Sequence, residues 1–186
     1  MTTRWRPGFE PDHLYFITTT AAARALIFQD DLVKRIVTDS LYYICLMNRV
    51  TLYAFVLMPN HLHVILQCPE QRAPPAWARA LKSATSRLIV RHYQVAGNLR
   101  ALRSLRSMVT RPHKQAHKVW EDGYLAKEVW TPDFLAQKVE YIHNNPVQPH
   151  WLLAEAPEDY AWSSARFYLR DEPSVIPVAD VRELMA

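Results

Sequence analysis

Residues 50–67 read VTLYAFVLMPNHLHVILQ, two apolar runs separated by a Met-Pro-Asn turn. Val50–Leu57 and His61–Gln67 are rich in β-branched, aromatic and aliphatic side chains, which favours two strands. Because so short a turn joins them, the two strands are expected to pair as an antiparallel β-hairpin. The rest of the fold is predicted outward from this hairpin.

On the N-terminal side of the hairpin, the sequence predicts one strand and one helix. Leu14–Thr20 (LYFITTT) has the β-branched and aromatic composition of a strand. Asp30-Asp31 then opens a helix with apolar residues at the 3.6-residue period: Val33, Ile36, Val37, Leu41 and Ile44. On the other side of the hairpin, a helix is expected over Trp77–Tyr93, with an apolar stripe at Trp77, Leu81, Ala84 and Leu88.

The C-terminal half continues the alternation with weaker signals. Ala96–Lys118 is basic with little periodicity, so a helix, a long loop and an unstructured segment all stay open. A short strand is expected around Lys118–Asp122. Thr131-Pro132-Asp133 predicts a capped helix start, and this helix runs towards Asn144. Two further short helices are expected, Trp162–Leu169 and Val178–Met185.

This order, β-α-β-β-α-(β)-α, predicts an α+β fold. It fits a ferredoxin-like antiparallel sheet with helices packed on one face. A chain of 186 residues suits a single domain. We expect the domain to span residues 1–170, with 96–118 as a basic insertion, and 171–186 to form a C-terminal tail for which a helix is one option.

Composition excludes several classes of protein. The chain has three glycines and no GxGxxG, GxxxxGK[ST] or GxSxG motif, so dinucleotide-binding, P-loop and α/β-hydrolase functions lose their main support. No apolar run reaches the roughly 18–20 residues of a membrane span, and the N-terminus lacks a hydrophobic signal core. Cys45 and Cys68 stand apart without a CxxC motif. A reduced, cytoplasmic protein is therefore expected.

The net charge of +4 hides an uneven distribution. Gln71–Trp120 contains eleven Lys or Arg residues and no Asp or Glu, whereas the remaining residues hold 11 basic and 18 acidic groups. An acid-free segment inside an otherwise acidic chain indicates a surface that meets a polyanion. An ordinary solvated basic face is the alternative.

Two local patterns carry chemistry. His61 and His63 alternate on a strand, so both imidazoles project from the same face and can share one divalent metal ion; half-exposed strand histidines without a metal are the alternative. Tyr141 and Asn145 lie four residues apart and share a helical face. Tyr141 is a candidate nucleophile, or else a core aromatic. With the basic segment, these groups are the parts required for metal-assisted phosphodiester cleavage.

Five motifs in order resemble one family. LMPNHLHVIL (57–66) resembles the HUH motif, histidine–hydrophobe–histidine, of single-tyrosine DNA transposases, and YIHNNPV (141–147) resembles the tyrosine helix of their REP-associated branch (RAYT). The other matching pieces are YFITTTAAARALIF (15–28), VWEDGYLAKEV (119–129) and WSSARFYL (162–169). The resemblance therefore covers most of the chain, from about residue 13 to 170.

The resemblance implies a metal-dependent transesterase. His61 and His63 would bind Mg²⁺ or Mn²⁺, with Asn145 as third ligand in a place where relatives often have glutamine. Tyr141 would attack a phosphate of single-stranded DNA, leaving a 5′-phosphotyrosine link and a free 3′-hydroxyl. Relatives act on DNA hairpins as monomers or homodimers, and a set of basic residues would contact this DNA: Arg4, Arg6, Arg79, Lys82, Arg87, Arg100, Arg103 and Arg106.

Two other functions are weighed against this one. A catalytically inactive nucleic-acid-binding module on the same fold would keep the basic surface without needing His61, His63 and Tyr141. A metal-dependent hydrolase of small phosphate esters would give no role to the acid-free segment, and few carboxylates accompany the histidines. The sequence favours the transposase.

Overall fold

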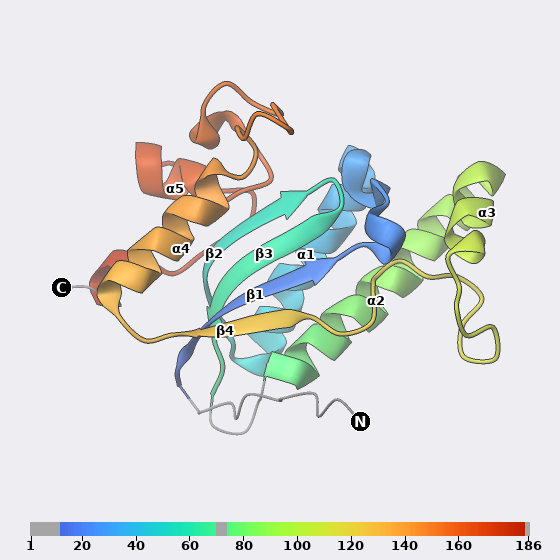
Figure 1. Ribbon diagram of the computed structural model, residues 1–186, viewed down its shortest axis with the longest axis horizontal. Coiled ribbons are helices and arrows are strands. Elements are labelled where there is room, and N and C mark those ends of the chain that lie inside the picture. Colours follow the sequence, from blue (N-terminus) through green and yellow to red (C-terminus); the bar gives the residue numbers. More distant parts are fainter. Residues whose placement is uncertain (1–11, 70–73, 185–186) are drawn as a thin grey trace.

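The computed structural model describes residues 12–69 and 74–184. These residues form four strands and five α-helices (Figure 1). They are β1 (Leu14–Thr20), α1 (Asp31–Asn48), β2 (Thr51–Met58), β3 (His61–Gln67), α2 (Pro74–Val95), α3 (Leu99–Ser107), β4 (Leu125–Val129), α4 (Pro132–Asn144) and α5 (Ala165–Arg170). Four short 3₁₀ turns complete the order: η1 (Ala22–Arg24), η2 (Ile27–Gln29), η3 (Pro157–Asp159) and η4 (Val181–Leu184).

The strands form one antiparallel sheet in the order β2-β3-β1-β4. The predicted hairpin is β2-β3, and the α+β, ferredoxin-like arrangement expected from the sequence is confirmed. The strand expected around Lys118–Asp122 is wrong, because this segment contributes only an isolated bridge between Trp120 and Ala21. The fourth strand is instead β4, at the edge of the sheet next to β1. Its charged, half-exposed residues show little apolar alternation, so the strand is recognised only by its pairing with β1.

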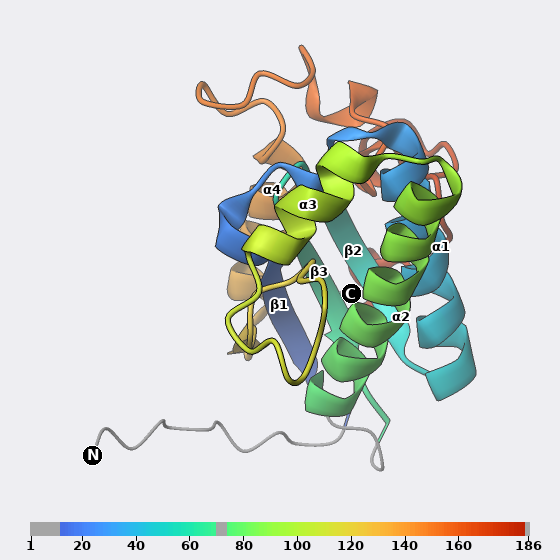
Figure 2. The ribbon, with the colours of Figure 1, turned by 90° about the vertical axis from the view of Figure 1, so that its right-hand side faces the viewer.

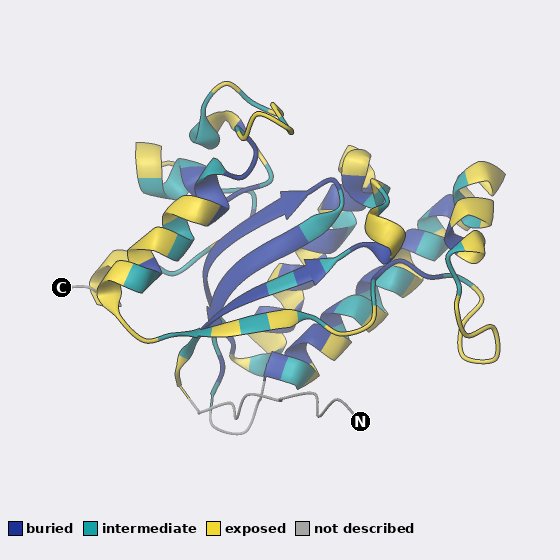
Figure 3. Cartoon of the chain, in the orientation of Figure 1, coloured by how far each residue is buried: buried dark blue, intermediate teal, exposed yellow. Residues whose placement is uncertain are grey.

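Helices cover both faces of the sheet (Figure 2). α1 and α2 pack on one face, where Leu41 and Leu81 join a core with Leu62 and Leu66 of β3. α4 packs on the other face, where buried apolar residues of β1, β2 and β3 meet Leu135 and Ile142. The expectation that the helices lie on one face is therefore wrong for α4. β2 and β3 are accordingly buried almost throughout (Figure 3).

The buried stripe of α2 differs from the predicted one after its second turn. Trp77 and Leu81 are buried as expected, but Leu88 is 40% exposed. The stripe continues instead through Thr85, Ile89 and Tyr93. Thr85 is accommodated because its hydroxyl donates to the carbonyl of Leu81 and accepts from the indole Nε1 of Trp120. A polar residue with satisfied hydrogen bonds therefore belongs to the buried stripe, which the periodicity of apolar residues had placed at Ala84 and Leu88.

The basic segment 96–118, left open by the sequence, contains the short helix α3. The side chain of Asn98 caps it by accepting from the amide of Ala101. Leu105 is its buried anchor, and the Lys118 amide donates to the Leu105 carbonyl. Its arginines are exposed, because only a narrow stripe of α3 meets the rest of the chain.

The C-terminal segment closes the free edge of β2. Backbone amides and carbonyls of Trp162 and Ser164 bond to Leu57 and Phe55, and the Ala179 amide bonds to Leu52. Beyond residue 170 the chain buries apolar side chains in both cores, Ile176 and Val181. This part is therefore packed on the domain, with η4 where a helix was one option. Pairing at this edge also removes a template for aggregation.

Candidate active site

The two histidines of β3 project together from the sheet face that α4 covers. His63 lies opposite Thr18 of β1, and His61 lies opposite Thr20. Their ring centroids are 4.6 Å apart. Leu62, between them, points into the core on the other face. The alternation predicted from the sequence therefore holds in the structure.

Hydrogen bonds orient both imidazole rings. Nδ1 of His63 lies 2.7 Å from the hydroxyl of Thr18, and Nδ1 of His61 lies 2.6 Å from Oδ1 of Asn60, to which it donates. Nε2 of His63 is buried and has no hydrogen-bond partner among the described residues. An unpartnered buried nitrogen beside a second imidazole is the arrangement of a metal ligand whose orientation a neighbouring bond defines.

Both imidazoles are neutral at physiological pH. Burial lowers the pKa of His61 to about 4, and the hydrogen bond with Asn145 acts in the opposite direction. Burial also lowers the pKa of His63 to about 3, with further contributions from the charges of His61 and Lys138. A neutral imidazole offers a free lone pair, so the pair is in the form that binds a metal ion.

Tyr141 lies beside the histidines and outside the core. It sits on α4, which begins where the hydroxyl of Thr131 caps the Phe134 amide. Its ring centroid lies 5.2 Å from that of His63 and 5.9 Å from that of Phe16, both at steep interplanar angles. The side chain is 48% exposed. Tyr141 is therefore not the core aromatic that the sequence left as an alternative, because other residues of α4 fill the core.

Asn145 joins the same cluster from the end of α4. It is the C-terminal cap residue of the helix, 6% exposed, and Pro146 follows it. Its side chain hydrogen-bonds to His61. The three residues predicted as ligands thus converge, and the unpartnered Nε2 of His63 with a neighbouring amide oxygen fits a divalent cation. In the part of the chain that the structure describes, no three His, Cys, Asp or Glu side chains gather as an alternative metal site.

Several residues at the site were not predicted from the sequence. Phe16 stacks on His63 at a centroid distance of 5.2 Å, and Trp151 lies 6.1 Å from His61. The ammonium group of Lys138 lies over the ring of Tyr141. A signal for Lys138 was present, because Lys138, Tyr141 and Asn145 follow one another at three and four residues and so share a stripe of α4.

His143, two residues after Tyr141, has a structural position. It is 4% exposed, and its Nε2 shares a hydrogen bond of 2.9 Å with the hydroxyl of Ser164. Burial lowers its pKa to about 4. This side chain faces away from Tyr141 and links α4 to the segment that covers the β2 edge.

The residues predicted to contact DNA lie mainly on the other side of the sheet. α2 and α3 carry the exposed ones, Arg79, Arg87, Arg100, Arg103 and Arg106, and Figure 1 shows α3 far from α4. Lys82 is not free, because its Nζ donates to the carbonyls of Glu121, at 2.9 Å, and Gly123. Arg4 and Arg6 lie outside the described residues. The basic surface and the histidine–tyrosine cluster are therefore separated by the sheet.

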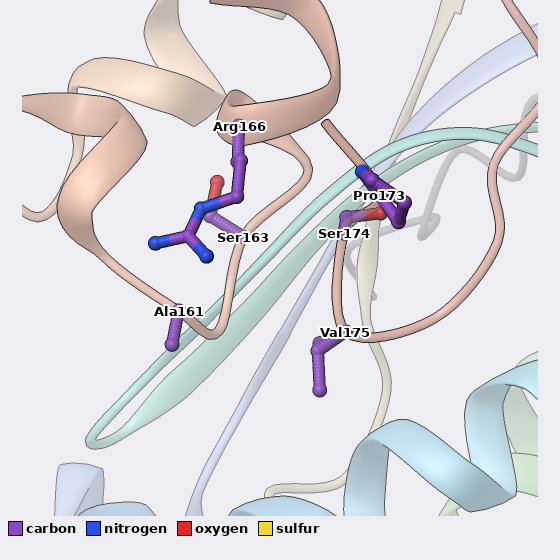
Figure 4. Close-up of a pocket in the computed structure, with 6 residues that line it drawn as sticks. All are labelled: Ala161, Ser163, Arg166, Pro173, Ser174 and Val175. Atoms are coloured by element: carbon purple, nitrogen blue, oxygen red, sulfur yellow. The ribbon is translucent and has the colours of Figure 1, made fainter. Parts of the chain in front are cut away.

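A small cavity of about 150 Å³ opens near the C-terminal segment (Figure 4). It contains none of the predicted site residues. Its lining comes from one stretch of the chain after α4: Ala161, Ser163, Arg166, Pro173, Ser174 and Val175. The candidate site is instead the open surface around Tyr141.

One family model and two solved structures are similar to this chain. The family model described as "Transposase IS200 like" matches residues 11–145. A solved structure of a REP-associated tyrosine transposase bound to a REP hairpin is 16% identical, covers 97% of this chain and 93% of that chain, and has a TM-score of 0.66. A putative transposase from Deinococcus radiodurans is 22% identical, covers 76% of this chain and 97% of that chain, and has a TM-score of 0.48. No curated protein matches the chain.

Proposed function

Because the chain belongs to the IS200-like transposase family, we propose that it cuts and rejoins single-stranded DNA at hairpin-forming, REP-like sequences. The observation that carries this proposal is the position of Tyr141, with its ring centroid 5.2 Å from that of His63, in the same chain. A half-exposed phenol beside two neutral imidazoles is suited to attack a phosphate that enters from solvent. The motifs of the REP-associated branch support the assignment to that branch.

In the proposed reaction, the phenolic oxygen of Tyr141 attacks the scissile phosphorus. A bond forms between this oxygen and phosphorus, and the bond from phosphorus to the 3′-oxygen breaks. The phenol loses its proton and the departing 3′-oxygen gains one, so the products are a 5′-phosphotyrosine and a free 3′-hydroxyl. Attack by a 3′-hydroxyl on the phosphotyrosine then rejoins DNA and restores Tyr141.

His61, His63 and Asn145 are the residues that would hold Mg²⁺ or Mn²⁺. Such an ion supplies charge neutralisation at the phosphate oxygens and favours an in-line approach of the nucleophile. Thr18 and Asn60 orient the imidazole rings, and burial keeps both rings neutral. All of these groups are side chains of this chain, and they have this arrangement before DNA binds.

The DNA hairpin is proposed to bind the arginines of α2 and α3. Their exposure supports phosphate contacts, which supply most of the affinity of proteins for nucleic acids. The likeness to a structure bound to a REP hairpin supports DNA as the partner. Since the sheet separates α2 from Tyr141, the single-stranded flank would pass around an edge of the sheet to reach the site.

A covalent adduct tests the proposal. The protein is incubated with a labelled hairpin that carries a single-stranded 5′ flank, with and without Mn²⁺, and is then denatured. Wild type is expected to form a denaturation-resistant adduct that needs the metal ion. Tyr141→Phe is expected to form none, whereas Tyr43→Phe, which alters an exposed tyrosine of α1, forms it normally.

Other outcomes separate the alternatives. Binding of the hairpin without an adduct would favour the catalytically inactive nucleic-acid-binding module. An adduct that forms equally well with Tyr141→Phe would show that another residue is the nucleophile.

A further inference from the structure

Lys138 projects into a group of aromatic side chains at the candidate active site. Its Nζ lies 4.9 Å from the ring centroid of Phe134, 5.3 Å from that of Phe16 and 5.5 Å from that of Tyr141. Phe16 in turn stacks on His63. The rings therefore hold the ammonium group between α4 and β1, on the side of the helix that carries Tyr141.

Among the described residues, this ammonium group has no counterion. Within residues 12–69 and 74–184, Lys138 forms no ion pair and donates no hydrogen bond. Aromatic faces attract a cation but leave its three N–H donors without a strong acceptor. A half-buried cation in this state is suited to bind an anion, and charge-assisted hydrogen bonds to phosphate are among the stronger ones in proteins.

The position of Lys138 connects it to the reacting groups. It lies three residues before Tyr141 and seven before Asn145, on one stripe of α4. Its charge also contributes, after burial and the charge of His61, to lowering the pKa of His63. Lys138 is therefore within electrostatic reach of the histidines and of any phosphate that approaches the phenol.

We propose that the ammonium group of Lys138 binds a non-bridging oxygen of the scissile phosphate while Tyr141 attacks it. This inference rests on the proposed function. Negative charge grows on the phosphoryl oxygens during the transfer, and a fixed cation beside them lowers the barrier. Lys138 transfers no proton in this role. It adds a positive charge on the side of the phosphate that faces α4.

A purely structural role predicts a different result. In that case the contacts of Lys138 with the three rings would only attach α4 to the sheet. Removing the lysine side chain would then weaken the binding of any DNA equally. A contact with the phosphate predicts instead that the effect of Lys138 depends on the charge of that one phosphate. A neutral linkage at the cleavage position distinguishes the two.

The experiment uses protein with Tyr141→Phe, which prevents cleavage, and two hairpin oligonucleotides in buffer with Mg²⁺. The oligonucleotides differ only at the linkage where wild type forms its adduct, which is a phosphodiester in one and an uncharged methylphosphonate in the other. We expect the parent protein to bind the phosphodiester about tenfold more tightly. Adding Lys138→Gln should remove most of this preference, and adding Lys138→Arg should retain it.

A matched control is Arg49→Gln, which removes an exposed positive charge where α1 ends and β2 begins. It should keep the full preference. The inference is overturned if Lys138→Gln also keeps the preference, or if it weakens binding of both oligonucleotides equally. If wild type forms no adduct or binds no hairpin, the proposed function itself fails, and this inference fails with it.

Discussion

His143 makes the folded chain sensitive to acid, and replacing it measures this effect. Burial lowers its pKa from 6.5 to about 4. Because the folded-state pKa lies below the unfolded one, the unfolded chain takes up the proton first as the pH falls. The free energy of unfolding therefore decreases as the pH falls from about 6.5 to about 4, and this contribution is fully present only above the unfolded pKa.

The magnitude follows from the two pKa values. Proton linkage gives a loss of about 2 kcal/mol between about pH 7 and pH 5 for His143 alone. His61 and His63 are depressed by similar amounts or more, so the three histidines together remove about 6 kcal/mol over this range. Since domains are typically stable by about 5–15 kcal/mol in total, this loss is a large fraction of the free energy of unfolding.

The assay is urea denaturation followed by circular dichroism at about pH 7 and pH 5, with EDTA present so that no metal ion holds the histidines neutral. Wild type should lose about 6 kcal/mol and His143→Gln about 4 kcal/mol. Glutamine keeps a hydrogen-bonding group near Ser164 but does not titrate. His113→Gln, which alters an exposed histidine, serves as the control. Equal losses in wild type and His143→Gln would refute the reasoning.

Three further predictions concern the metal ion, Lys82 and the basic surface. At about 100 times its dissociation constant, Mn²⁺ should stabilise wild type by about 2.7 kcal/mol and raise Tm by about 5–10 °C in a thermal scan, whereas His63→Gln should show little shift. Lys82→Met should lower the free energy of unfolding by about 1–3 kcal/mol, since two carbonyls lose a charged donor, and a change in hairpin affinity alone would contradict this. Replacing Arg100, Arg103 and Arg106 of α3 by Gln should reduce the magnitude of the slope of log K against log salt for a hairpin by about 2–3. An unchanged slope would show that the DNA binds elsewhere.

Local patterns predicted most of the secondary structure correctly. The hairpin β2-β3, the capped start of α4 at Thr131 and the alternation of His61 and His63 depend on residues close together in the chain. Weak local patterns led to the errors. β4 has a mixed, half-exposed sequence and is defined by its pairing with β1. Thr85 of α2 is buried in the core because the indole Nε1 of Trp120 donates a hydrogen bond to its hydroxyl.

At the site, the sequence predicted which side chains share one face of a strand or helix, but it did not predict which side chains from other elements they contact. The spacing of Tyr141 and Asn145 indicated one helical stripe, but whether Tyr141 faced the core or solvent depended on how α4 meets the sheet. Lys82 and Lys138 show the same limit. Lys82 bonds to carbonyls distant in the chain and Lys138 enters an aromatic group, and neither set of contacts follows from residues close along the sequence.

The sequence alone determined which residues could act together on one strand or one helix, because periodicity places side chains on faces through local backbone geometry. It also carried the motifs that resemble the transposase family. Only the tertiary structure decided that α4 covers the sheet face opposite α1 and α2, that Tyr141 meets His63 there, and that the basic helices lie on the other side. These relations rest on contacts between residues far apart in the chain, and their energies depend on packing that no local pattern contains.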